Sequence, residues 1–181
     1  MTPVETFWIG FALIFATVGV VRGFLKELGV TLVLVVTLFG LTRIMSNQQT
    51  ILDFISVRLK LPVVSQWIDR PEVWLAFYSF AILGAVFIAY QGYVITYPGE
   101  NPKGIQGVLL ALLVGFINGY LVAGSLWFYV NLYKDPVVKL GLLTLPYTSV
   151  ADKLIPVLPP DLLGRYLPFL VVFMIILLVI K

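Results

Sequence analysis

The chain has 181 residues, of which 60% are hydrophobic and 12% are charged, with a net charge of +3 and a mean hydropathy of +1.02. Soluble domains are roughly half apolar and a quarter charged. The composition therefore excludes an ordinary soluble domain and predicts an integral membrane protein. The small, scattered positive charge is typical of membrane topology signals and argues against nucleic-acid binding.

The chain also contains no cysteine and no histidine. Disulfides, thiolate metal sites and thiol nucleophiles are therefore excluded, and the commonest metal ligand and general base are missing. We expect no cofactor: on its own the chain should hold no haem, chlorophyll or transition metal as a ligated group. We expect no catalytic residue either, because a serine hydrolase without histidine would need a lysine at a suitable depth.

Five apolar segments predict membrane-spanning helices, each of which needs about 20 residues. In chain order they are residues 4–21, 28–42, 73–97, 104–133 and 162–180. The second segment is short, and it reaches bilayer thickness only if Lys26 and Arg43 extend to the two interfaces. The expected fold class is an all-α integral membrane protein with about five transmembrane helices.

The first two segments are joined by the hexapeptide Arg22-Gly23-Phe24-Leu25-Lys26-Glu27. So short a charged connection predicts an N-terminal helical hairpin that crosses the bilayer and returns. The two cations are suited to anchoring the turn among the headgroups, and Glu27 is close enough in sequence to pair with either of them.

Two longer connections show helical, amphipathic spacing and predict helices lying in the membrane interface, near residues 47–60 and 137–158. In the first, Ile51, Leu52, Ile55 and Leu59 form one stripe, and Pro62 ends it. Prolines interrupt the second repeatedly. The alternative for both is a plain loop packed on the membrane domain. The domain organisation expected is a four-helix membrane domain over 1–160, followed by an extra C-terminal helix over 161–181.

Small residues recur every fourth position in the fourth segment: Gly107, Ala111, Gly115, Gly119 and Ala123. Such a ladder lets two helix backbones approach closely in lipid. Its partner is either within the chain, where Ala12, Ala16 and Gly19 have similar spacing, or in another subunit.

The acidic residues fall at segment ends or in connections, with none deep in a segment. This pattern argues against an ion-coupled transporter and against an intramembrane aspartyl protease. The polar side chains inside segments, Gln91, Asn118 and Asn131, are interpreted as hydrogen-bonding groups between helices or as end residues rather than as ligand contacts. Ser79 and Ser125 are interpreted as satisfied helix hydroxyls rather than as nucleophiles, because no lysine lies at a plausible depth.

Three stretches of the chain resemble the colicin V production protein (CvpA) family. These are the turn motif Arg22 to Glu27, the glycine-rich residues 107–122, and the Leu-Pro segment 149–159. The resemblance implies a small bacterial inner-membrane protein associated with toxin export and envelope homeostasis, with no established reaction. The chain departs from the family at Asn118, where an arginine is common, at Asn101-Pro102-Lys103, where an Asp-Arg pair is common, and in its fifth apolar segment.

The leading hypothesis is a non-enzymatic membrane protein that acts through contacts in the bilayer with other membrane proteins or with itself. One alternative is a structural accessory subunit of a large respiratory or photosynthetic complex. A weaker one is an oligomeric small transporter or channel. Basic residues are more numerous on the side of the long connections, which would place these in the cytoplasm. The family resemblance favours the reverse, with a cytoplasmic hairpin and an outward N-terminus.

Overall fold

The computed structural model describes residues 4–58, 60, 66, 68, 70–91, 95–141 and 147–180, and these residues form helices and connections without any β-strand. Four helices are long and apolar enough to cross a membrane: α1 (Val4–Arg22), α2 (Phe24–Ser46), α5 (Pro71–Gln91) and α6 (Gly104–Leu132). A bent pair near the C-terminus raises the number to as many as five. The expected all-α membrane fold is confirmed.

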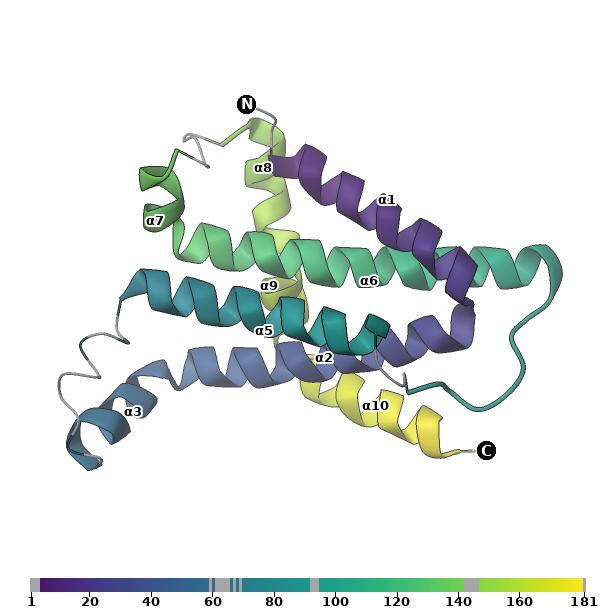
Figure 1. Ribbon diagram of the computed structural model, residues 1–181, viewed down its shortest axis with the longest axis horizontal. Coiled ribbons are helices and arrows are strands. Elements are labelled where there is room, and N and C mark those ends of the chain that lie inside the picture. Colours follow the sequence, from purple (N-terminus) through teal and green to yellow (C-terminus); the bar gives the residue numbers. More distant parts are fainter. Residues whose placement is uncertain are drawn as a thin grey trace.

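The central helix is α6, which packs against α1, α2 and α5. Figure 1 shows that α1 and α2 diverge from their common turn, with α5 and α6 between them. Although adjacent in sequence, α1 packs mainly on α6 and α2 packs mainly on α5, α6 and the C-terminal helix. The N-terminal hairpin is therefore an open V rather than two helices in close contact.

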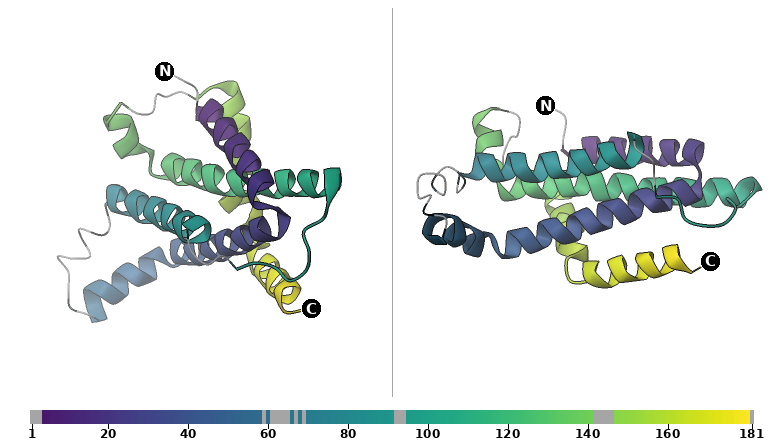
Figure 2. Two further views of the ribbon diagram at one scale, coloured as in Figure 1. Left: turned by 45° about the vertical axis from the view of Figure 1, so that its right-hand side comes forward. Right: turned by 60° about the horizontal axis from the view of Figure 1, so that its bottom comes forward.

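The C-terminal segment is not the single straight span over 162–180 that the sequence predicts. Helix α8 (Ser149–Leu154), the short η2 (Ile155–Val157) and α9 (Pro159–Leu163) run across the other helices in Figures 1 and 2, and α10 (Leu167–Val179) then turns beside α2. The bend is 58°. Pro168 accounts for it, because its ring lacks an N–H and would clash with the carbonyl one turn earlier.

Two other segment boundaries also differ from the prediction. Helix α2 begins four residues before the expected span and includes Glu27. Helix α5 ends at Gln91, so Tyr97 lies outside it, although its side chain is buried and donates a hydrogen bond from its hydroxyl to the carbonyl of Met174 at 2.8 Å. The connection before α6 therefore packs onto α10.

The long connections contain short helices, as their spacing indicates. The first holds α3 (Gln48–Asp53) and the π-helical η1 (Phe54–Arg58), and the second holds α7 (Lys134–Lys139) before α8. Leu52 is buried while Phe54 and Val57 are exposed, so the first segment keeps an outward apolar face. Leu59, Pro62 and residues 142–146 lie outside the described residues.

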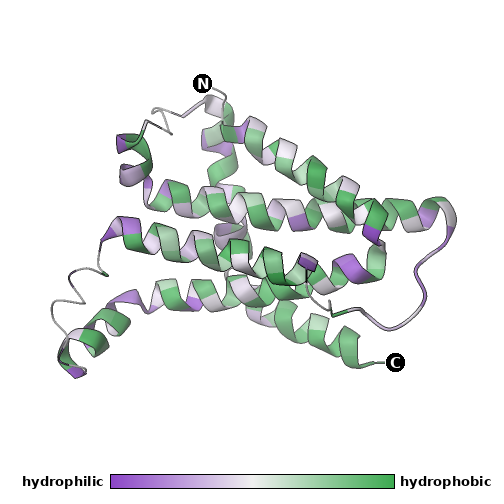
Figure 3. Cartoon of the chain, viewed as in Figure 1, coloured by the Kyte–Doolittle hydropathy of each residue, from purple (hydrophilic) through white to green (hydrophobic). Residues whose placement is uncertain are grey.

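Aromatic side chains fill the core between α5 and α6. Tyr78 and Tyr129 stack with ring centroids 4.2 Å apart, and the Tyr133 ring also stacks on Tyr78, with centroids 5.9 Å apart. Hydrophobic residues cover the helices along their length, and hydrophilic ones gather mainly at helix ends and in connections (Figure 3). A bundle whose helices are apolar all round is suited to a lipid environment.

Candidate functional site: a buried polar cluster at the first turn

The turn between α1 and α2 depends on Gly23. Its φ of 90° lies in the left-handed region that side chains disfavour, so glycine permits the chain to leave one helix and enter the next within a single residue. A Cβ at this position would lie 3.1 Å from the side-chain nitrogen Nδ2 of Asn101. The turn is therefore closed by a residue from the connection that precedes α6.

Asn101 caps helix α2. Gly23 is the N-cap residue and has no side chain to accept a bond from the first amides, and instead Asn101 Oδ1 accepts from the Leu25 N–H at 3.0 Å. The first amides of a helix lack intrahelical partners, and a side-chain oxygen stabilises them. The Tyr97 N–H, donating to the Leu25 carbonyl at 3.5 Å, ties the same connection to the same turn.

Glu27 is completely buried in the first turns of α2. Its Oε2 accepts two hydrogen bonds, one from the Tyr90 hydroxyl at 2.9 Å and one from Asn118 Nδ2 at 2.8 Å. Its Oε1 lies 3.4 Å from Arg22 Nε, an ion pair rather than a hydrogen bond. The carboxylate thus joins residues of α1, α2, α5 and α6.

Arg22 covers the outer side of this cluster. Its guanidinium lies 4.3 Å from the centroid of the Tyr90 ring, and Nη2 donates to the carbonyl of Ala89 at 3.4 Å. An arginine over an aromatic face gains a favourable cation–π interaction as well as its ion pair. Phe15 packs edge-on against the same Tyr90 ring at 5.5 Å.

Asn118 links the cluster to the middle of α6. Besides bonding the Glu27 carboxylate, its Nδ2 donates to the Glu27 backbone carbonyl at 3.1 Å. The Thr31 hydroxyl donates to Asn118 Oδ1 at 2.7 Å and also lies 2.9 Å from the Glu27 carbonyl. Since a hydroxyl carries one proton, Thr31 shares it between two acceptors.

Chemically, the cluster is a network in which every member has a partner inside the cluster, although the buried Glu27 Oε1 has only its ion pair and no hydrogen bond. One acid, one base and three neutral polar side chains pair mainly with one another, so the charge is compensated inside the bundle. Burying a carboxylate in lipid is costly unless it is paired in this manner. The arrangement therefore fixes four helices relative to one another.

The burial of Glu27 is not indicated by the sequence. The acidic residues were expected at segment ends or in connections, with none deep in a span, and Glu27 does lie in the first turn of α2, but it has no exposed surface. The apolar run was counted from Leu28, which placed the carboxylate in the turn. Of the two cations available to it, the partner is Arg22, while Lys26 is exposed.

The remaining residues singled out from the sequence have different places. Phe24 opens α2 half-buried, and Gln91 is the exposed last residue of α5. Ser125 is fully buried on α6. Sequence reasoning did not identify Tyr90 or Thr31 as members of the cluster, or Asn101 as the cap of α2. Thr31 follows Glu27 by one helical turn, which is the only sequence signal that connects any of them to it.

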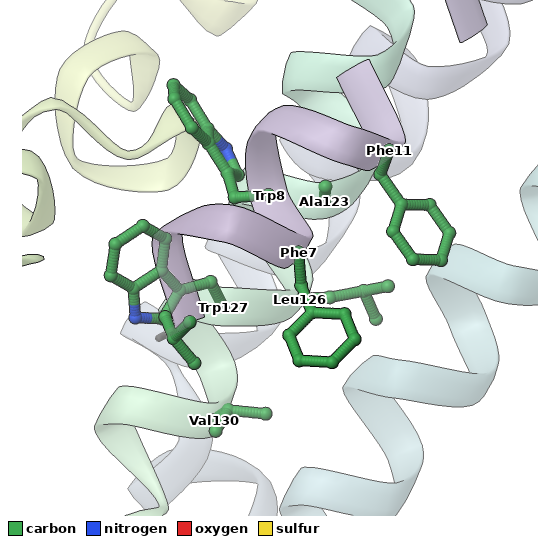
Figure 4. Close-up of a pocket in the computed structure, with 8 residues that line it drawn as sticks. Phe7, Trp8, Phe11, Ala123, Leu126, Trp127 and Val130 are labelled. Atoms are coloured by element: carbon green, nitrogen blue, oxygen red, sulfur yellow. The ribbon is translucent and has the colours of Figure 1, made fainter. Parts of the chain in front are cut away.

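The small-residue ladder does not meet one partner along its whole length. Ala111, Gly115 and Gly119 face α1, where a Cβ on Gly115 would lie 2.5 Å from the Phe15 carbonyl and one on Gly119 would lie 2.6 Å from the Ala12 Cα. Gly107 instead packs on the carbonyl of Pro102, and Ala123 lines a groove beside α1 (Figure 4). Of the two alternatives, the structure places the ladder's close contact within the chain.

No family model, curated protein or solved structure matches this chain.

Proposed function

We propose that this chain is a non-catalytic, multi-pass membrane protein of the CvpA type, which works by binding other membrane proteins in the plane of a bacterial inner membrane. The polar cluster has a structural role inside the chain. It holds the first turn, α5 and α6 together so that the apolar outer faces keep a fixed shape.

The observation that carries this proposal is that the polar groups of the cluster pair mainly with one another. Active sites and transport sites present polar groups to a substrate, whereas here Glu27 directs its oxygens to Arg22, Tyr90 and Asn118 of the same chain. An internally compensated network is what a structural role requires.

A second observation concerns the outer surface. Large apolar side chains are more than 40% exposed along α1 and α10, including Phe7, Phe11, Leu13, Ile14, Phe169, Val172 and Phe173. In the membrane such faces contact either lipid or another helix, and neighbouring helices recognise one another by shape.

The proposal is tested by purification of the full chain from its native membrane in mild detergent, after brief cross-linking, with identification of the proteins that co-migrate. We expect defined membrane-protein partners. Glu27→Ala, which removes the carboxylate of the polar cluster, should release these partners, while Lys26→Ala at the exposed neighbouring position should not. Co-migration with a respiratory or photosynthetic complex would identify the chain as an accessory subunit, and isolation without any partner would contradict the proposal.

One observation favours the transporter alternative. Glu27 and Arg22 form an ionisable pair within the helical bundle, and such pairs mark ion pathways in many membrane proteins. The purified chain in sealed liposomes distinguishes the two functions. Proton or cation flux that Glu27→Gln abolishes would support transport, whereas flux equal to that of empty liposomes would leave the binding function.

A further inference from the structure

The segment that follows α2, made of α3 and η1, is fixed to one end of the bundle. The Tyr133 hydroxyl, just after α6, donates a hydrogen bond to Gln48 Oε1 at 3.1 Å. Leu52 on α3 is only 6% exposed and belongs to the hydrophobic core. Figures 1 and 2 place the segment at the end of the bundle opposite the first turn, where α2 and α6 end and α5 begins. Contacts within the chain therefore determine which face of the segment is turned inward.

The outer face of the same segment is apolar. Phe54 is 54% exposed and Val57 is 73% exposed, and both belong to η1. At the end of a membrane-spanning bundle, water disfavours such side chains, whereas the boundary between lipid headgroups and acyl chains favours them. A segment with one face on the bundle and an apolar face outward is therefore suited to lie along the membrane surface.

Basic side chains flank the two apolar ones. Arg58 ends η1, and Lys60 follows with a φ of 52°, a left-handed conformation in which helices commonly end. Both side chains are exposed, as is that of Arg43 in the last turn of α2. Long basic side chains lay their apolar stems along lipid and keep the charged head at the level of the headgroups. The segment thus presents apolar and cationic groups side by side.

The charge of these cations is not neutralised within the segment. Residues 43–60 carry three basic side chains and one acidic one, Asp53, which accepts a long hydrogen bond from Gln49 at 3.5 Å. In the described part of the chain none of the three cations forms an ion pair, although Arg43 lies 5.3 Å from the centroid of the Phe39 ring. The exposed Glu72 at the start of α5 offsets part of the charge. A net positive charge remains for a partner outside the chain.

We propose that α3 and η1 form a surface that binds anionic phospholipids in preference to zwitterionic ones. Phe54 and Val57 enter the boundary between headgroups and acyl chains, and Arg43, Arg58 and Lys60 pair with phosphates whose charge no choline or ethanolamine group cancels. The surface is separate from the polar cluster at the first turn and requires only that the bundle spans a membrane. It holds for either orientation of the chain.

The test uses the full chain with Val57→Cys, which carries an apolar fluorophore as the only cysteine, in phosphatidylcholine liposomes. The probes are phosphatidylglycerol and phosphatidylcholine with the same nitroxide on the same acyl carbon, each added at the same mole fraction. A nitroxide quenches the fluorophore only at short range. We expect both lipids to quench it and phosphatidylglycerol to do so about threefold more, since cations near the surface concentrate anionic lipid. High salt should reduce the excess.

Charge variants of the labelled chain assign the excess to this segment. Arg58→Gln together with Lys60→Gln should bring the two lipids close to equal quenching, while both still reach the label. The matched control is Lys26→Gln together with Lys103→Gln, two exposed cations at the opposite end of the bundle, which should keep the excess. A label at Val150→Cys, an exposed apolar position on α8 with one acidic and one basic neighbour, should show no excess. Thermal unfolding should be unchanged in each variant, because all these side chains are exposed.

Equal quenching of the Val57→Cys label by the two lipids, without any charge variant, would overturn the proposal. So would an excess that survives Arg58→Gln with Lys60→Gln, or one that the control pair removes to the same extent, because the cations of the segment would then not be its cause. An equal excess at Val150→Cys would show enrichment around the whole chain and contradict the proposal too. If neither lipid quenches the label, the segment faces water or a protein instead of the membrane, which also overturns it.

Discussion

At the scale of single residues, the most consequential arrangement is the burial of a glutamate beside an arginine inside a lipid-soluble bundle. Glu27 has no exposed surface, while the Arg22 side chain keeps 17% of its own. The pair is tolerated because Tyr90 and Asn118 both donate hydrogen bonds to Oε2 of the carboxylate, while the buried Oε1 has the ion pair with Arg22 and no hydrogen bond. Removing one partner leaves the other charge uncompensated, which costs more than the pair itself contributes.

We therefore predict that Glu27→Gln lowers the free energy of unfolding in detergent by roughly 2–3 kcal/mol. This is less than for a fully buried broken pair, because Arg22 retains some contact with the outside. The double variant Arg22→Gln, Glu27→Gln should recover part of the loss. Lys26→Gln is the matched control and should change stability little, since Lys26 is exposed. Strictly additive losses in the double variant would contradict the coupling.

A second residue-scale prediction concerns the cap supplied by Asn101. Asn101→Ala removes the acceptor of the Leu25 N–H and should lower stability by about 1 kcal/mol, the usual cost of a lost cap. Asn101→Asp keeps the acceptor and places a negative charge at the positive end of the α2 dipole, so it should be as stable as the unmodified chain or more so. Thermal unfolding in detergent measures both. Equal losses in the two variants would exclude capping.

At the scale of elements, the α1–α6 contact is stabilised by the close approach of two backbones, which glycine and alanine permit, rather than by large side chains. Backbones that approach this closely gain dispersion contacts that larger side chains would prevent. A Cβ on Gly19 would lie 2.5 Å from the Ala111 carbonyl, so both helices need small residues at the crossing. The two helices are not neighbours in sequence. Through this contact α6 fills part of the space between α1 and α2, the two arms of the N-terminal hairpin.

Gly115→Ala should consequently destabilise the bundle by about 1–3 kcal/mol through overpacking, and Gly119→Ala should do the same. Gly84 in α5 is the matched control, because a Cβ there has no atom within 4 Å. Gly84→Ala should be neutral or stabilise by up to about 1 kcal/mol, since alanine is the better helix former. Gly104 is a poorer control because of its φ of 66°. Thermal unfolding measures these changes, and a stability change of the same sign for Gly115→Ala and Gly84→Ala would contradict the close contact.

At the scale of the whole molecule, contacts relate the two ends of the bundle. The Thr148 hydroxyl bonds Glu5, which puts the second long connection beside the start of α1. At the other end, Tyr97 contacts Leu25 and Met174, which puts the connection before α6 beside the first turn and α10. Figure 1 shows the marked ends of the chain on different sides of the bundle.

Single cysteines test this topology cleanly, because the chain has none of its own. Ser149→Cys and Lys103→Cys lie at exposed positions, and with an outward N-terminus we expect the first to react with an impermeant reagent in intact cells and the second only after permeabilisation. Ile180→Cys should behave like Lys103→Cys if the bent C-terminal segment completes a crossing. The reversed pattern would invert the orientation, and labelling of Ile180→Cys together with Ser149→Cys would remove the fifth crossing.

The sequence by itself determined the membrane environment, the all-α fold and the approximate positions of the four long helices, because each follows from local composition and from the length that a bilayer imposes. It also indicated the turn at Gly23 and the small residues of α6. Only the tertiary structure decided which helices pair, that a 58° bend interrupts the last apolar segment, and that Glu27 lies inside the bundle rather than at the surface of the turn. Tyr90 lies 63 residues after Glu27 in the sequence, and Asn118 lies 91 residues after it. Hydropathy carries no information about contacts between residues so far apart in the sequence. A charge next to an apolar run has the same hydropathy whether it faces the headgroups or a partner, and only packing distinguishes the two.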